Sequence, residues 1–138
     1  MSPLILLLGS NINENLLKNI IDKIKNINNI LLILSSEKEL NNMLNEFDIY
    51  MRLSTIETIC KNIKRHNENI NGSLNFLMSV LIEIEELLVI LNNKIDYHKT
   101  KYFNKYRKND LTKEIENLKT LNNKLEKRYN ILIDTLKI

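Results

Sequence analysis

The chain has 138 residues, a formal net charge of +3 and an apolar fraction of 43%, enough for one compact domain with a hydrophobic core. The charge is too small to indicate nucleic-acid binding by itself. Cys60 is the only cysteine, which excludes an internal disulfide, and the apolar run 4–8 is too short for a signal peptide or a membrane span. We therefore expect a soluble protein of the reducing cytoplasm that makes no membrane contact.

The first half of the chain contains three short apolar runs, at 4–8, 30–34 and 49–53. Each run is followed by a small polar residue with a glutamate three positions later, which is the spacing of a helix capping box. The pairs are Asn11 with Glu14, Ser36 with Glu39, and Ser54 with Glu57. Strands that alternate with helices are typical of a parallel sheet with right-handed crossovers. The sequence therefore predicts a helix-dominated α/β fold, with a small three-stranded parallel βαβαβ unit over residues 1–71.

A second interpretation of the same region is an all-α bundle or coiled coil. Apolar residues keep a heptad spacing straight through the second predicted strand, at Leu17, Ile20, Ile24, Ile27, Leu31 and Leu34. Short apolar runs cannot be assigned to strand or helix by period alone. The alternative stays open at this point.

The second half carries two heptad runs that predict an antiparallel helical hairpin, residues 73–138, packed on the first unit. The predicted interaction seam consists of Leu74, Leu77, Leu81, Ile84, Leu88, Leu91, Ile95, Leu111, Ile115, Leu118, Asn122, Leu125, Tyr129, Leu132 and Leu136. Gly72 is expected to end a helix and Ser73 to cap the next one, and Asn109 and Asp110 are expected to form the hairpin turn.

Asn122 is the one polar residue at an a position of this seam. Such a residue usually fixes the register of a coiled coil at some cost in stability, so replacement by leucine is expected to raise the melting temperature. The chain lacks Ala, Gln and Trp and is rich in Asn, Ile and Lys, as expected of an AT-rich genome, whether viral, phage, bacterial or protist. This bias weakens any argument that depends on a single asparagine.

The predicted helix 73–95 is apolar on nearly every side. Besides its seam it carries Val80, Ile82, Leu87, Val89 and Ile90. A helix that is apolar all round is buried on several sides, and one partner helix with a small sheet cannot cover it. We therefore expect the chain to self-associate or to act as a subunit of a larger assembly.

A hydroxyl-rich sheet edge is the first candidate for chemistry. If the α/β fold holds, the ends of the strands bring together Gly9, Ser10, Asn11, Ser35, Ser36, Ser54 and Thr55. Ligands bind at this edge of parallel sheets, and helix N-termini hold anions. A small enzyme or anion binder is therefore one alternative function, although helix capping explains the same residues.

Two short segments resemble known families. Leu8-Gly9-Ser10-Asn11 resembles the opening turn of the pterin pyrophosphokinases, but the acidic metal-binding pair of that family has no counterpart here. The segment 50–55 resembles the strand end of serine recombinases, which implies Ser54 as nucleophile and Arg52 as phosphate clamp. The arginine-rich catalytic helix of that family is missing, so neither resemblance assigns the chain to a family.

The segment 97–108 is a candidate nucleic-acid contact, because basic residues alternate there with aromatic ones. The basic residues are Lys99, Lys101, Lys105, Arg107 and Lys108. A nucleic-acid-binding accessory protein is thus a second alternative, and a solvated hairpin end is the ordinary explanation.

Metal, cofactor and catalytic sites are not indicated by the sequence. His66, His98 and Cys60 have no helical ligand spacing, and a zinc site needs three or four ligands. We expect no cofactor and no enzymatic activity. The favoured interpretation is a structural or scaffolding protein that acts through helical packing.

Overall fold

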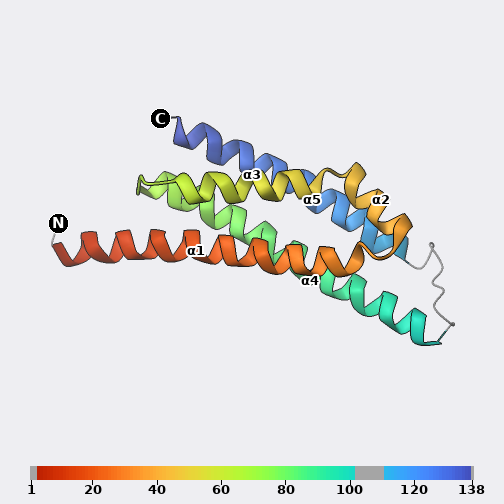
Figure 1. Ribbon diagram of the computed structural model, residues 1–138. Helices are drawn as coiled ribbons and strands as arrows, with labels where there is room; N and C mark the ends of the chain where they lie inside the picture. The colour runs from red at the N-terminus through yellow and green to blue at the C-terminus, as the bar shows by residue number, and fades with distance from the viewer. Residues whose placement is uncertain (1–2, 102–110, 138) are drawn as a thin grey trace.

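The computed structural model describes residues 3–101 and 111–137, with side chains for 14–97 and 111–137. Within these ranges 90% of the residues are helical and there is no strand. The five helices are α1 (Pro3–Leu34), α2 (Lys38–Glu46), α3 (Ile49–Asn62), α4 (Glu68–Lys101) and α5 (Thr112–Leu136), as Figure 1 shows.

The predicted α/β fold is wrong, and the all-α alternative describes the structure. The runs 4–8 and 30–34 lie inside α1, and the run 49–53 begins α3. The heptad from Leu17 to Leu34 is the true signal, because all six of its residues are buried along one face of α1. Side chains that repeat every three and four residues share a face only in a helix. The spacing of the apolar residues therefore predicted the secondary structure correctly, whereas the short apolar runs suggested strands that do not form.

The capping signals also have a different role from the one predicted. The Ser35 hydroxyl donates to the carbonyl oxygen of Leu32 at 2.6 Å, and the Ser36 hydroxyl donates to that of Ile33 at 3.0 Å. Both serines therefore satisfy carbonyls at the C-terminal end of α1, which lack helical partners. Asn11 and Ser54 lie inside α1 and α3, and the helix boundary near Ser36 has Glu37 as its N-cap.

The helix end predicted at Gly72 is wrong as well, because α4 runs unbroken from Glu68 to Lys101. Gly72 has no positive φ, and a Cβ placed on it would meet no atom within 4 Å. Both it and Ser73 are ordinary helical positions. The turn predicted at Asn109 and Asp110 lies outside the described residues, and the division of the chain into 1–71 and 73–138 stays a prediction.

The four longer helices form a bundle in which α4 makes the most extensive contacts, with α5 on one side and α1 on the other. α1 and α4 run in the same direction, and α3 and α5 run in the opposite one (Figure 1). α3 packs on α1 and, less extensively, on α5, while the short α2 packs on α3. The arrangement places two antiparallel neighbours, α1 with α3 and α4 with α5, side by side.

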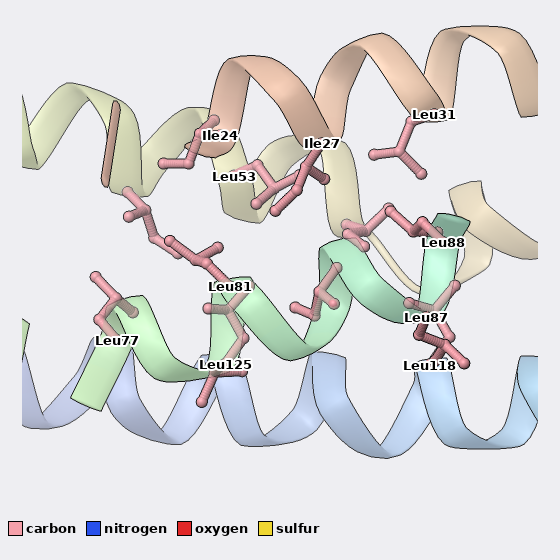
Figure 2. Packing of buried hydrophobic residues seen from close by; sticks show 14 of the residues in the cluster. Ile24, Ile27, Leu31, Leu53, Leu77, Leu81, Leu87, Leu88, Leu118 and Leu125 are labelled. Carbon is pink, nitrogen blue, oxygen red and sulfur yellow. The ribbon is translucent and has the colours of Figure 1, made fainter. Parts of the chain in front are cut away.

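The core fills the space between these helices with leucine and isoleucine. Figure 2 shows Ile27 and Leu31 of α1 and Leu118 and Leu125 of α5 approaching α4 from opposite sides. Leu53 adds the contribution of α3 to the same cluster. One contiguous cluster reaches all five helices, so packing of apolar faces, rather than capping, holds the bundle together.

Candidate protein-binding surface

The predicted seam brings α4 and α5 together within the chain. All seven of its α4 residues are buried, as are Leu111, Leu118, Asn122, Leu125 and Leu132. Ile115, Tyr129 and Leu136 are partly buried against the same core. The hairpin-like packing that the heptads predict is therefore confirmed, and the seam lies in the interior of the bundle rather than on its surface.

Three polar contacts fix the antiparallel register of this pair. Ser73 Oγ lies 3.1 Å from Thr135 Oγ1, Lys124 Nζ lies 3.5 Å from Glu83 Oε2, and Lys94 bonds Glu114. As residue number rises along α4 it falls along α5, which only an antiparallel pair allows. These contacts flank the apolar seam along its length, so a shift of one turn would break all three.

Glu114 is the one buried carboxylate among the described residues, and it is 6% exposed. The hydrogen bond from Lys94 holds the pKa of the Glu114 carboxyl below its ordinary value, while burial acts in the opposite direction. The second carboxylate oxygen, Oε2, has no hydrogen-bond partner. Within the described residues the carboxylate of Glu114 forms an ion pair with Lys94 that joins α4 to α5.

Asn122 and Arg52 form a polar junction where α5 meets the α2–α3 turn. Asn122 Nδ2 donates to the carbonyl oxygen of Phe47 at 2.6 Å, and Arg52 Nη1 donates to the carbonyl oxygen of Asn122 at 2.9 Å. Arg52 Nη2 also lies 3.4 Å from Glu126 Oε2. The arginine that resembles a recombinase phosphate clamp is therefore occupied by contacts within the chain.

The predicted hydroxyl-rich edge does not form, because the structure has no sheet within its described residues to bring its members together. Gly9, Ser10 and Asn11 lie in α1, and Ser54 and Thr55 lie in α3. Ser35 and Ser36 donate to carbonyl oxygens at the end of α1, as described above. These residues are spread over three places in the fold, so the strand-end argument for an anion site is lost.

The basic-aromatic segment 97–108 lies largely outside the described residues. Lys99 and Lys101 belong to α4, but their side chains are not described. Lys105, Arg107 and Lys108 lie in the range 102–110, which the structure does not describe. Tyr97 is 55% exposed on α4. The nucleic-acid contact stays a prediction.

Cys60 is 2% exposed on the core side of α3, and burial raises the pKa of its thiol to about 12. A thiol is nucleophilic only as thiolate, so we expect this residue to be unreactive in the folded chain. Among the residues that the structure describes, no group of three or more His, Cys, Asp or Glu side chains is placed to hold a metal ion.

The outward side of α4 carries exposed apolar residues. Ile82, Val89, Ile90 and Tyr97 are 38%, 43%, 48% and 55% exposed. Glu86 and Asn93 are exposed between them. The separations of three, four, seven and eight residues place all six side chains on one face, opposite the buried seam. We call these six residues the outer stripe.

The outer stripe follows from the sequence pattern already noted, in which α4 is apolar nearly all round. Val80 and Leu87 of that set are buried in the bundle, whereas Ile82, Val89 and Ile90 remain exposed. α1 and α5 pack on two sides of α4, and within the described residues its third side carries the exposed members of this set. Sequence reasoning found the excess of apolar residues but could not tell which of them the bundle would bury.

A smaller apolar spot lies across the outer edge of α4 and α5. Phe76 is 57% exposed and Ile131 is 44% exposed, and the Arg128 guanidinium lies 5.0 Å from the centre of the Phe76 ring. The cation–π contact and the arginine stem cover part of this ring. The spot is therefore less suited to docking than the outer stripe.

No protein-family model matches the chain, and comparisons with curated proteins and with solved structures returned no similar protein. Within residues 3–101 and 111–137, none of the helices combines the length and the hydropathy that crossing a membrane requires.

Proposed function

We propose that the protein is a non-enzymatic structural or assembly subunit, and that it acts by docking another protein surface on the outer stripe of α4. The observation that carries this proposal is the row of four large, partly exposed side chains, Ile82, Val89, Ile90 and Tyr97, on one helix face. From residue 82 to residue 97 this face extends for about 22 Å at the ordinary helical rise. Helix-on-helix interfaces are built from rows of this length and spacing.

The rest of the described surface supports the same proposal. Polar pairs such as Lys23 with Glu85 at 2.8 Å lie at the edges of the bundle, where they close the contacts between helices. Leu32 and Ile33 at the end of α1 and Met51 on α3 are also exposed, but within the described residues they do not continue into a row along a helix face. Several exposed apolar residues on one helix face are the feature that marks an interaction site. The proposed location is the cytoplasm, as the lone cysteine suggested.

Site-specific photo-crosslinking tests this proposal. A benzophenone amino acid is placed at Val89 in the outer stripe and, as a matched control, at Asn26, which is exposed on α1. The protein is then irradiated in the cells that make it naturally. We expect a discrete protein adduct from position 89 and none from position 26. Adducts absent at position 89, or equal at both positions, would contradict a docking role for this face.

A further inference from the structure

We infer that the occupant of the outer stripe is a second copy of this chain, bound antiparallel through α4 about a two-fold axis close to Val89 and Ile90. This inference rests on the proposed function and names the partner. Its basis is the order of side-chain types along the stripe, which is nearly the same whether it is read from residue 82 to residue 97 or in reverse. Ile82 and Tyr97 lie at the two ends, Glu86 and Asn93 lie between, and Val89 and Ile90 lie at the centre.

A two-fold axis at the centre pairs each of these positions with its chemical complement. Ile82 of one copy meets Tyr97 of the other, and Val89 meets Ile90, so apolar side chains face apolar ones. Glu86 meets Asn93, whose amide can donate to the carboxylate. An isologous interface needs this self-complementarity, because the same patch serves both partners.

Charge selects the antiparallel orientation over the parallel one. An in-register parallel pair would place Glu86 of the stripe against its own copy. At the flank both orientations bring acidic residues together, Glu83 with Glu83 in the parallel pair and Glu83 with Asp96 in the antiparallel one. Like charges at equivalent helix positions destabilise the pair. In the antiparallel pair Glu86 instead comes next to Asn93 and within one position of Lys94, which is 45% exposed while bonding Glu114. On the stripe itself, Glu86 therefore finds a donor in only one of the two orientations.

The acidic Glu86 is the one charged residue of the stripe. The stripe contains no lysine, arginine or proline. Long basic side chains on an uncovered apolar face are a common protection against association, and here they lie elsewhere. The two copies would bury the side of α4 that is exposed in the described part of the chain, which fits a helix that is apolar nearly all round.

Directed disulfide formation tests the register. Two variants are made, Glu86→Cys and Asn93→Cys, both at exposed positions, with Cys60 left in place because it is buried. Each is oxidised alone and then as an equal mixture. We expect a disulfide-linked dimer in the mixture and far less in either variant alone. A strong 86–86 link in the first variant would indicate parallel pairing and overturn the inference.

Light scattering on the unmodified chain gives the second readout. We expect a mass of twice the 16.3 kDa chain at micromolar concentration. The double variant Val89→Lys and Ile90→Lys places four lysines at the axis and should raise the Kd of the dimer by about tenfold or more. Its helical circular dichroism should stay unchanged, because both side chains are exposed. Leu32→Lys, on an exposed apolar residue of α1, is the matched control and should leave the mass unchanged.

The outcomes separate this inference from the proposed function. If the chain is monomeric and cross-links from position 89 to a different protein, the dimer inference is wrong and the proposed docking role of the outer stripe stands. A monomeric chain without any adduct overturns both. A dimer whose mass is insensitive to the lysine pair but sensitive to Leu32→Lys would place the interface elsewhere and overturn the inference.

Discussion

The side-chain amide of Asn122 on α5 donates a hydrogen bond of 2.6 Å to the carbonyl oxygen of Phe47, the residue that ends α2. Carbonyls at the end of a helix lack an intrahelical partner. The contact joins residues that are 75 positions apart and ties the α2–α3 turn to the bundle. The heptad position of Asn122 suggested a residue that fixes the register of a coiled coil, whereas its contact is with the carbonyl at the end of a helix.

We predict that Asn122→Leu lowers the free energy of unfolding by about 1–2 kcal/mol, because it removes the donor from a partly buried carbonyl. The heptad pattern alone predicts the opposite sign. Chemical denaturation monitored by circular dichroism measures the change. Asn123→Leu at the exposed neighbouring position is the control and should stay within about 0.5 kcal/mol of the unmodified chain. A rise in stability for Asn122→Leu would contradict this prediction and would show that removing the buried, unpartnered Oδ1 of Asn122 outweighs the loss of the Phe47 contact.

Replacement of Gly72 is expected to raise the stability of the chain. Gly72 lies inside α4 without a positive φ, and a Cβ there meets no atom within 4 Å. Gly72→Ala should therefore raise the free energy of unfolding by about 0.5–1 kcal/mol, through the lower backbone entropy of the unfolded chain. Thermal unfolding measures the effect. A loss of stability would mean that the helix breaks at this residue, as the Asn-Gly-Ser sequence first suggested.

The Lys94–Glu114 pair predicts a dependence of stability on pH. The folded-state pKa of Glu114 lies below its ordinary value of 4.5. Its contribution is therefore complete above that value and is lost as the pH falls through the folded-state pKa. Glu114→Gln should lower stability by about 1–2 kcal/mol at neutral pH, a moderate figure because Lys94 is partly exposed.

The gap in stability between the unmodified chain and Glu114→Gln should shrink as the pH is lowered below 4.5. Denaturation curves at several pH values measure it. Glu116→Gln makes the same charge change at an exposed position of α5 and serves as the control. A gap that is constant with pH would show that the ionised carboxylate is not the source of the stabilisation.

The burial of Cys60 can be tested with a thiol reagent. Because burial raises the pKa of its thiol to about 12, we expect no reaction with a thiol reagent at mildly alkaline pH in the folded chain. The chain has one cysteine, so the signal is unambiguous. Reaction should occur at the rate of unfolding, and denaturant should make it fast. Rapid labelling under native conditions would place Cys60 at the surface.

The sequence predicted the buried faces of the helices better than the residues at which the helices begin and end. The heptads of α4 and α5 located the hairpin-like pair, and the run from Leu17 to Leu34 located the buried face of α1. The three strands were wrong because a five-residue apolar run fits a strand and a buried helix face equally well. The N-cap predicted at Ser36 was wrong for a similar reason, because a serine hydroxyl can accept from an N–H at the start of a helix or donate to a carbonyl at its end.

The candidate surface could be predicted only in part. Composition showed that α4 has more apolar residues than one partner can cover, but Leu87 and Val89 look alike in the sequence and differ in the fold. Which of them is exposed depends on where α1 and α5 lie around α4. That placement depends on contacts between segments far apart in the chain, such as Lys23 with Glu85, and no local pattern contains it.

The position of α4 between α1 and α5 also governs how the chain can fold during synthesis. The apolar face of α1 finds its main partner only in α4, which the ribosome makes after α2 and α3. α1 with α3 forms a smaller contact, so the nascent first half carries an exposed row of isoleucine and leucine until residue 95 has left the exit tunnel. The half-made chain is therefore the form most in need of a chaperone.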